Sequence, residues 1–103
     1  MAEFVTVGRA DEIVEGEAKA FPVNGQEIAV SRVSGALYAF SDICTHRRCN
    51  LANGGEIDGI SIECECHGSV FSMATGEVLA SPATEPIATY QVRETEGQIE
   101  VDA

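Results

Sequence analysis

The sequence predicts an all-β, antiparallel fold, built as a small sandwich or barrel. Short stretches rich in β-branched and other apolar residues recur along the chain, and turn residues separate them at intervals of roughly 8–12 residues. No long stretch has the 3.6-residue periodicity of an amphipathic helix. With 103 residues, we expect one domain, and the hydrophobic fraction of 45% excludes a disordered chain.

The expected strands are joined by short turns. Asn24-Gly25 is the strongest turn signal, because this dipeptide favours two-residue hairpins. Further turns are expected at Ser34-Gly35, 74–76 and 95–97. In chain order we expect strands over 3–7, 17–23, 26–33, 36–42, 59–64, 68–73, 77–80, 87–94 and 98–103, with one helical turn or bend over 10–16.

The composition is strongly acidic. Seventeen acidic residues against six basic ones give a formal charge of −11, which argues against nucleic acid or an anionic membrane as a partner. This charge favours docking onto a basic protein surface, although it would also keep a small protein in solution. No apolar run reaches the roughly 20 residues of a membrane span, and the first residues lack a signal-peptide pattern. We therefore expect a cytoplasmic protein.

One segment, from about 42 to 84, holds all four cysteines and both histidines. Within a single domain spanning 1–103, it is interpreted as an inserted functional lobe. Its first motif is Cys44-Thr-His46. Its second begins at Cys64 and ends at His67, and 17 residues separate His46 from Cys64. Cys44 and His46 can point the same way in an extended segment, because residues two apart lie on one side.

Two thiolates and two imidazoles suit either a tetrahedral zinc ion or a two-iron, two-sulfide cluster. Two disulfides are a third interpretation, although cytoplasmic chains seldom use cysteines in this way. Zinc sites commonly keep the two cysteines in one pair. In this chain each pair mixes one cysteine with one histidine.

The two motifs resemble the signature of Rieske [2Fe–2S] proteins: Cys44-x-His46, then Cys64-x-x-His67 followed by Gly68. The flanks SDICTH, LANGGEIDG and ATGEVLASPATEPIATYQV are also similar, so the resemblance covers nearly the whole chain. It implies a Rieske-type antiparallel β-sandwich with an inserted cluster-binding lobe. It also implies that the two cysteines hold the buried iron and the two histidines the outer iron of a [2Fe–2S] cluster.

Cys49 and Cys66 are left over. The sequence around them resembles the Rieske proteins of cytochrome bc complexes, which carry a second cysteine in each ligand loop, and this implies a disulfide between Cys49 and Cys66. Such a bridge would stabilise the fold by about 3 kcal/mol in the chain-entropy model. A reducing cytoplasm opposes it, and two buried thiols are the alternative.

Three more residues match, or depart from, that signature. Ser69 is similar to a serine whose hydroxyl bonds a cluster sulfur and raises the reduction potential. Phe71 stands where those proteins have a tyrosine, so one hydrogen bond is expected to be missing. We therefore expect a reduction potential between those of dioxygenase-type Rieske ferredoxins and of the cytochrome bc proteins. Pro82 matches a third loop that shields the cluster. The alternatives are an ordinary loop serine and a simple turn.

Arg47 and Arg48 lie inside the first ligand loop of this acidic chain. They are either solvated charges or groups that raise the potential and contact carboxylates of a partner.

The resemblance implies a soluble, monomeric Rieske ferredoxin, which carries one electron from a flavin reductase to a terminal oxygenase. The chain has no nucleotide-binding or substrate-pocket motif, so we do not expect it to be an enzyme by itself. A Rieske subunit of a larger redox enzyme, such as a nitrite reductase or an arsenite oxidase, is one alternative. A zinc-stabilised interaction module is another.

Overall fold

The computed structural model describes residues 4–23, 25–43, 50–52, 55–65, 68–81 and 83–102, and within them the all-β prediction is confirmed. The strands are β1 (Phe4–Arg9), β2 (Ala18–Val23), β3 (Gln26–Val33), β4 (Ala36–Ser41), β5 (Glu56–Asp58), β6 (Ser61–Glu63), β7 (Val70–Ser72), β8 (Val78–Ala80), β9 (Thr89–Thr95) and β10 (Gln98–Asp102). A short 3₁₀ helix, Ala10–Glu12, follows β1. Across these ranges no helix is long and apolar enough to cross a membrane.

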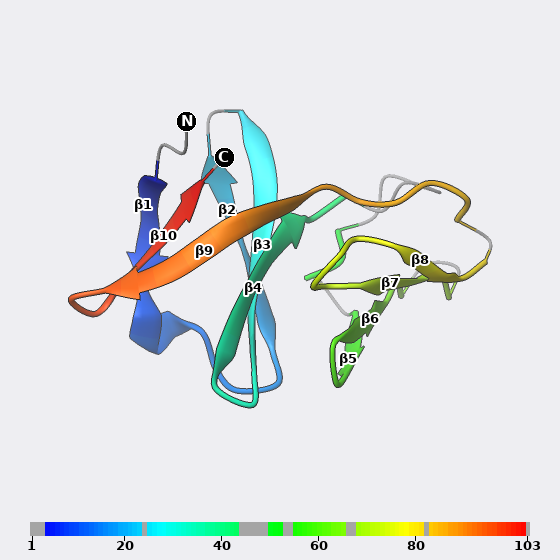
Figure 1. The fold of residues 1–103 in the computed structure, drawn as a ribbon, viewed down its shortest axis with the longest axis horizontal. Helices are drawn as coiled ribbons and strands as arrows, with labels where there is room; N and C mark the ends of the chain where they lie inside the picture. Colours follow the sequence, from blue (N-terminus) through cyan, green and yellow to red (C-terminus); the bar gives the residue numbers. More distant parts are fainter. Residues whose placement is uncertain are drawn as a thin grey trace.

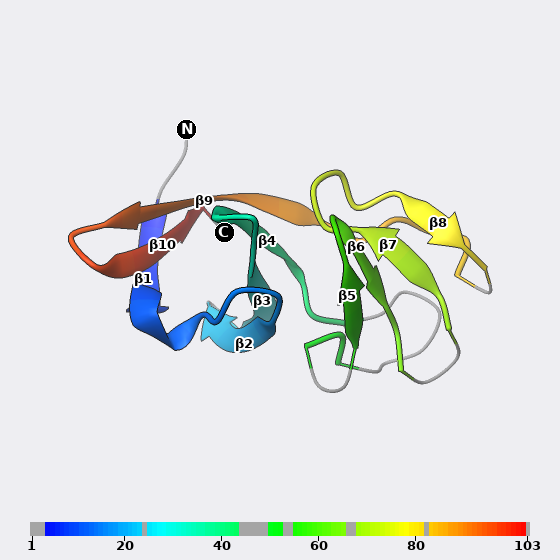
Figure 2. The same cartoon turned by 90° about the horizontal axis from the view of Figure 1, so that it is seen from below.

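The strands form two antiparallel sheets, which lie side by side in Figures 1 and 2. The larger sheet, the base sheet, has the order β1-β10-β9-β4-β3-β2, and its edge strands β1 and β2 also contact each other. The smaller sheet, with the order β5-β6-β7-β8, forms the lobe. The chain enters the lobe after β4 and returns through β9, which pairs with β4. The lobe is therefore an insertion between two neighbouring strands of the base sheet.

Turn chemistry explains the hairpins of the base sheet. Ser34 and Gly35 both have positive φ, 52° and 80°, and Glu96 and Gly97 repeat this pattern with 51° and 77°. Two successive residues with positive φ make the turn whose twist matches that of the flanking strands. The turns predicted at these two places are confirmed.

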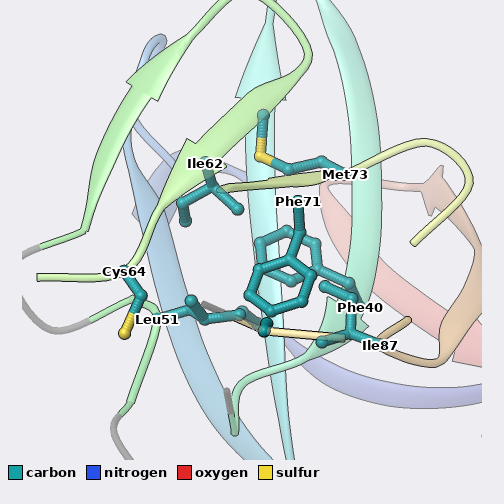
Figure 3. Close-up of a cluster of buried hydrophobic side chains, with 9 residues drawn as sticks. Phe40, Leu51, Ile62, Cys64, Phe71, Met73 and Ile87 are labelled. Carbon is teal, nitrogen blue, oxygen red and sulfur yellow. The ribbon is translucent and has the colours of Figure 1, made fainter. Parts of the chain in front are cut away.

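Two apolar clusters stabilise the fold. One lies inside the base sheet and includes Ile28, Ile99 and Val101. The other joins the two sheets, because Phe40 of β4 packs with Ile62 and Phe71 of the lobe (Figure 3). A polar contact also crosses this second cluster: the buried Ser31 hydroxyl donates to the Met73 sulfur over 3.2 Å. The lobe is thus packed directly against the base sheet.

Two details of the sequence prediction were wrong. The strand expected over 59–64 would place Ile60 and Ile62 on one face, but Ile60 is 49% exposed and Ile62 is fully buried. The strand begins only at Ser61, because Gly59 with φ +60° places Ile60 in the preceding turn. Strand β5 was not predicted, since Ile57 is its only apolar residue.

Candidate metal centre

Cys64 is the predicted ligand that the structure places. It follows β6, is 1% exposed, and lies beside Leu51 at the edge of the apolar cluster (Figure 3). Its carbonyl accepts the Gly68 N–H over 3.0 Å, and its N–H donates to the Ser69 carbonyl over 2.7 Å. Gly68 has φ +76°, which glycine adopts without strain. These two hydrogen bonds show that the chain turns back between Cys64 and Ser69.

A hydrogen bond joins this turn to the segment that follows β8. Ser69 is fully buried, and its Oγ accepts the N–H of Ala83, which is itself 3% exposed, over 3.0 Å. The serine therefore connects the second predicted ligand loop to the loop of Ser81 and Ala83. Within the part of the chain that the structure describes, Ser69 Oγ acts as an acceptor, for the Ala83 N–H.

The segment between β4 and β5 is closed at its base by Asp42. The Asp42 carbonyl accepts the Leu51 N–H over 2.6 Å, and its carboxylate accepts the Ala52 N–H over 2.7 Å. An isolated antiparallel bridge pairs Ile43 with Asn50. Hydrogen bonds therefore hold together the residues that flank positions 44–49 on either side. Sequence reasoning did not find this role of Asp42, because an aspartate after a strand has no distinctive pattern.

Phe71 lies in the core and not at a polar site. It is fully buried in β7, opposite Ile62 of β6, and its ring packs with Phe40 and Ile87 (Figure 3). An aromatic hydrocarbon ring cannot donate a hydrogen bond. Phe71 therefore contributes apolar packing at this position and supplies no hydrogen-bond donor.

The other predicted site residues lie outside the described residues. They are Cys44, His46, Arg47, Arg48, Cys49, Cys66, His67 and Pro82. Among the residues that the structure does describe, no group of three or more His, Cys, Asp or Glu side chains comes together to hold a metal ion.

The described residues nevertheless fit an iron–sulfur cluster. A buried thiol is a ligand for iron, and burial together with hydrogen bonds to sulfur sets the potential of such clusters. Cys64 provides the buried thiol, Ser69 provides a buried hydroxyl five residues later, and the apolar cluster around Leu51 excludes water on that side.

Comparison with known proteins decides the family. The model of the Rieske [2Fe-2S] domain matches residues 3–91. The chain belongs to the Rieske [2Fe-2S] family. Its cofactor is accordingly a Rieske-type [2Fe–2S] cluster, which confirms the predicted cofactor and sets aside the zinc module.

Individual relatives agree with this family along nearly their whole length. The chain is 35% identical to the anthranilate 1,2-dioxygenase ferredoxin subunit of Burkholderia cepacia over 102 residues, which are 99% of this chain and 94% of that protein. It is 36% identical to the biphenyl dioxygenase ferredoxin subunit of Pseudomonas sp. strain KKS102, over 87% of this chain and 83% of the relative.

Solved structures show the same Rieske fold. The ferredoxin of carbazole 1,9a-dioxygenase from Nocardioides aromaticivorans IC177 superposes with a TM-score of 0.90 at 31% identity, covering 97% of each chain. A chain from a complex of reduced oxygenase and oxidized ferredoxin in carbazole 1,9a-dioxygenase gives a TM-score of 0.87 at 34% identity, over 96% of this chain and 92% of that one.

Charge is distributed unevenly over this Rieske domain. The basic residues that the structure describes all lie in or beside the base sheet and form ion pairs. These pairs are Arg9–Asp11, Lys19–Glu12, Arg32–Glu94 and Arg93–Glu100. The hydrogen bonds from the Lys19 side chain and the Arg9 backbone N–H lower the pKa of Glu12 below its usual 4.5.

Beyond Arg47 and Arg48, the lobe has no basic residue to offset its acidic ones. Its sequence has no Lys or Arg from residue 50 to residue 92. Glu56 and Glu63 are exposed and lie directly opposite each other on β5 and β6. Like charges that face each other across a sheet repel. With no basic residue nearby in the sequence, this pair concentrates negative charge on the lobe.

Proposed function

We propose that this protein is the ferredoxin component of a dioxygenase system, carrying one electron at a time from a flavin reductase to a terminal oxygenase. The observation that carries the proposal is the match to ferredoxin subunits of dioxygenases over 99% of this chain and 94% of a relative's. Such components are electron carriers and not the catalysts, as the sequence predicted. We also place the protein in the cytoplasm.

In this proposal Cys44 and Cys64 bind the buried iron, and His46 and His67 bind the outer iron. The bound cluster accepts and releases one electron at a potential raised by its neutral imidazole ligands. The position of Cys64 supports this assignment, because its burial suits the ligand of an inner iron. The apolar cluster around Leu51 would keep water from that side, and the Ala83 N–H would hold the buried Ser69 hydroxyl in place. The single-domain organisation, with a lobe over about 42–84, is part of the same proposal.

We further propose that charge guides docking. The acidic lobe would be attracted to a basic surface on a partner, since opposite charges speed encounter between proteins. Arg47 and Arg48 would contact carboxylates at the loop itself. Electron-transfer rates should therefore fall with ionic strength, and Glu56→Gln/Glu63→Gln should weaken that dependence. Rates that do not respond to salt in either protein would contradict guided docking.

The direct test of the function is a reconstituted electron-transfer chain. Purified protein is mixed with a flavin-dependent ferredoxin reductase and NADH, and cluster reduction is followed by visible absorbance. Addition of a Rieske-type terminal oxygenase with its aromatic substrate should then reoxidise the cluster and yield product. Protein that purifies only within a larger complex, and that exchanges no electrons as a free monomer, would favour the alternative of a permanent subunit.

The Cys49–Cys66 disulfide stays a proposal. After acid removes the cluster, alkylation without reductant should leave two of the four cysteines unmodified if the bridge exists. Modification of all four would refute it.

A further inference from the structure

Asp42 is a fully buried carboxylate that the proposed function does not use. One oxygen, Oδ1, accepts the Ala52 N–H over 2.7 Å. The other, Oδ2, accepts the Asn50 side-chain amide, also over 2.7 Å. Both carboxylate oxygens are therefore occupied by donors that follow positions 44–49 in the sequence.

The backbone of Asp42 makes two more bonds in the same place. Its carbonyl accepts the Leu51 N–H over 2.6 Å, and its N–H donates to the Glu27 carbonyl over 3.0 Å. The Asn50 amide also donates to the Glu27 carboxylate. One residue thus ties both ends of the segment to each other and to β3 of the base sheet.

We infer that Asp42 and Asn50 form a loop clamp, a pair of positioning residues that fixes how the 44–49 segment presents its ligands to the cluster. This inference rests on the proposed function, because it takes Cys44 and His46 as ligands. Cys44 follows Asp42 by two residues, and His46 precedes Asn50 by four. A change in the clamp therefore alters the base from which both ligands project.

The chemistry of the pair is specific. A carboxylate accepts at both oxygens, whereas an amide side chain has one accepting and one donating end. With Asp42→Asn, the new amide can still accept from Ala52, but its NH₂ group then faces the NH₂ group of Asn50. With Asn50→Ala, the bond from the Ala52 N–H to Asp42 remains. The carboxylates of Asp42 and Glu27 both lose the Asn50 amide as their donor. The two variants remove the same link from opposite sides.

The test compares cluster retention and cluster spectrum in the intact holoprotein. Iron release to a chelator at a temperature well below unfolding should be about 10-fold faster in Asn50→Ala and in Asp42→Asn, the effect typical of losing a group that orients metal ligands. The paramagnetic resonance spectrum of the reduced cluster should shift or broaden in both variants. If Asp42→Asn does not fold, Asn50→Ala, at a half-buried position, is compared alone.

Matched controls separate positioning from charge and from stability. Asp58→Asn removes an exposed carboxylate of the lobe and should leave both measurements unchanged. Val101→Ala opens a cavity in the apolar cluster of the base sheet and lowers stability without removing a hydrogen bond of the clamp. In a Glu27→Gln background, the exchange Asp42→Asn/Asn50→Asp restores an amide–carboxylate bond in the reverse direction. It should return the iron-release rate toward that of Glu27→Gln alone.

The outcomes distinguish the clamp from the function. A normal Rieske spectrum with unchanged iron release in Asn50→Ala and Asp42→Asn would refute the clamp alone. Equal acceleration in Val101→Ala would also refute it, because global destabilisation would then explain the effect. Wild-type protein without a Rieske spectrum would instead refute the proposed function.

Discussion

Replacing Ser69 with alanine removes a buried hydroxyl that we expect to serve two purposes. Its oxygen accepts the Ala83 N–H over 3.0 Å. Its proton is expected to be donated to a cluster sulfur, as the resemblance to the Rieske signature implies. The substitution keeps the backbone bond from Cys64 N–H to the Ser69 carbonyl, so the turn itself is retained.

The two expected effects have different sizes and readouts. The Ala83 N–H, 3% exposed, loses its acceptor, and a buried unsatisfied donor costs about 1–3 kcal/mol. For a domain of this size the melting temperature should fall by about 4–15 °C. We expect the hydrogen bond from the hydroxyl to be about 1–2 kcal/mol stronger in the reduced than in the oxidised cluster, which raises the reduction potential by about 40–90 mV. The midpoint potential of Ser69→Ala should therefore be lower by that amount.

The assay is a redox titration of the purified holoprotein, together with anaerobic thermal unfolding. Ser72→Ala is the matched control. Ser72 is also buried, in β7, and its Oγ accepts the N–H groups of Ala74 and Thr75 over 3.3 and 3.2 Å. The Ser72→Ala substitution should lower the melting temperature and leave the midpoint potential unchanged.

A potential equal to that of the wild type in Ser69→Ala would refute the hydrogen bond to the cluster. Equal potential shifts in Ser69→Ala and Ser72→Ala would also refute it, since they would indicate a general effect of loosened packing.

Three other substitutions give independent tests. Phe71→Tyr supplies the missing phenol and should raise the midpoint potential by tens of millivolts, on the order of one charge-assisted hydrogen bond. Gly76→Ala should destabilise the fold by about 2 kcal/mol or more, because Gly76 has φ +81° and an added Cβ would overlap the Ile87 carbonyl. Glu12→Gln should flatten the acid limb of stability against pH: the folded pKa of Glu12 is lowered, so its stabilisation is present above pH 4.5 and is lost as the pH falls through the folded pKa.

Each of these predictions has a contradicting result. Phe71→Tyr with an unchanged potential would mean that a phenol there does not reach a sulfur. For the glycine, Gly35→Ala is the control, because its φ is +80° but an added Cβ meets nothing, and equal destabilisation would remove the steric argument. Melting temperatures of Glu12→Gln that parallel the wild type below pH 4.5 would exclude the contribution of the Lys19 pair.

Local signals predicted most of the base sheet. The hairpin at Ser34-Gly35 was predicted because a Ser-Gly dipeptide marks a turn, and the structure shows a turn there with φ of 52° and 80°. Strand β5 could not be predicted, since a three-residue strand with two charged residues has no useful alternation. The exposure of Ile60 depends on the positive φ of Gly59, which periodicity does not detect.

In the candidate site, too, some features could be predicted from the sequence and others could not. The candidate ligands can be read from the sequence, and their resemblance to the Rieske signature predicted the cofactor, whereas the residue types alone left zinc as an alternative. The clamp of Asp42 and Asn50 and the bond from Ala83 to Ser69 connect residues that are distant in sequence, and they depend on the packing of three loops. Such contacts follow from tertiary structure, and single-sequence patterns do not predict them.

The central claim is that two cysteines and two histidines hold the [2Fe–2S] cluster. Pulsed paramagnetic resonance of the reduced protein measures it most directly, because nitrogen nuclei bound to iron couple to the unpaired electron. We predict two coordinated imidazole nitrogens in the wild type and loss of this pair, with loss of the intact Rieske spectrum, in His46→Ala and in His67→Ala. A reduced cluster with no nitrogen coupling, or one that persists unchanged in both variants, would contradict the account.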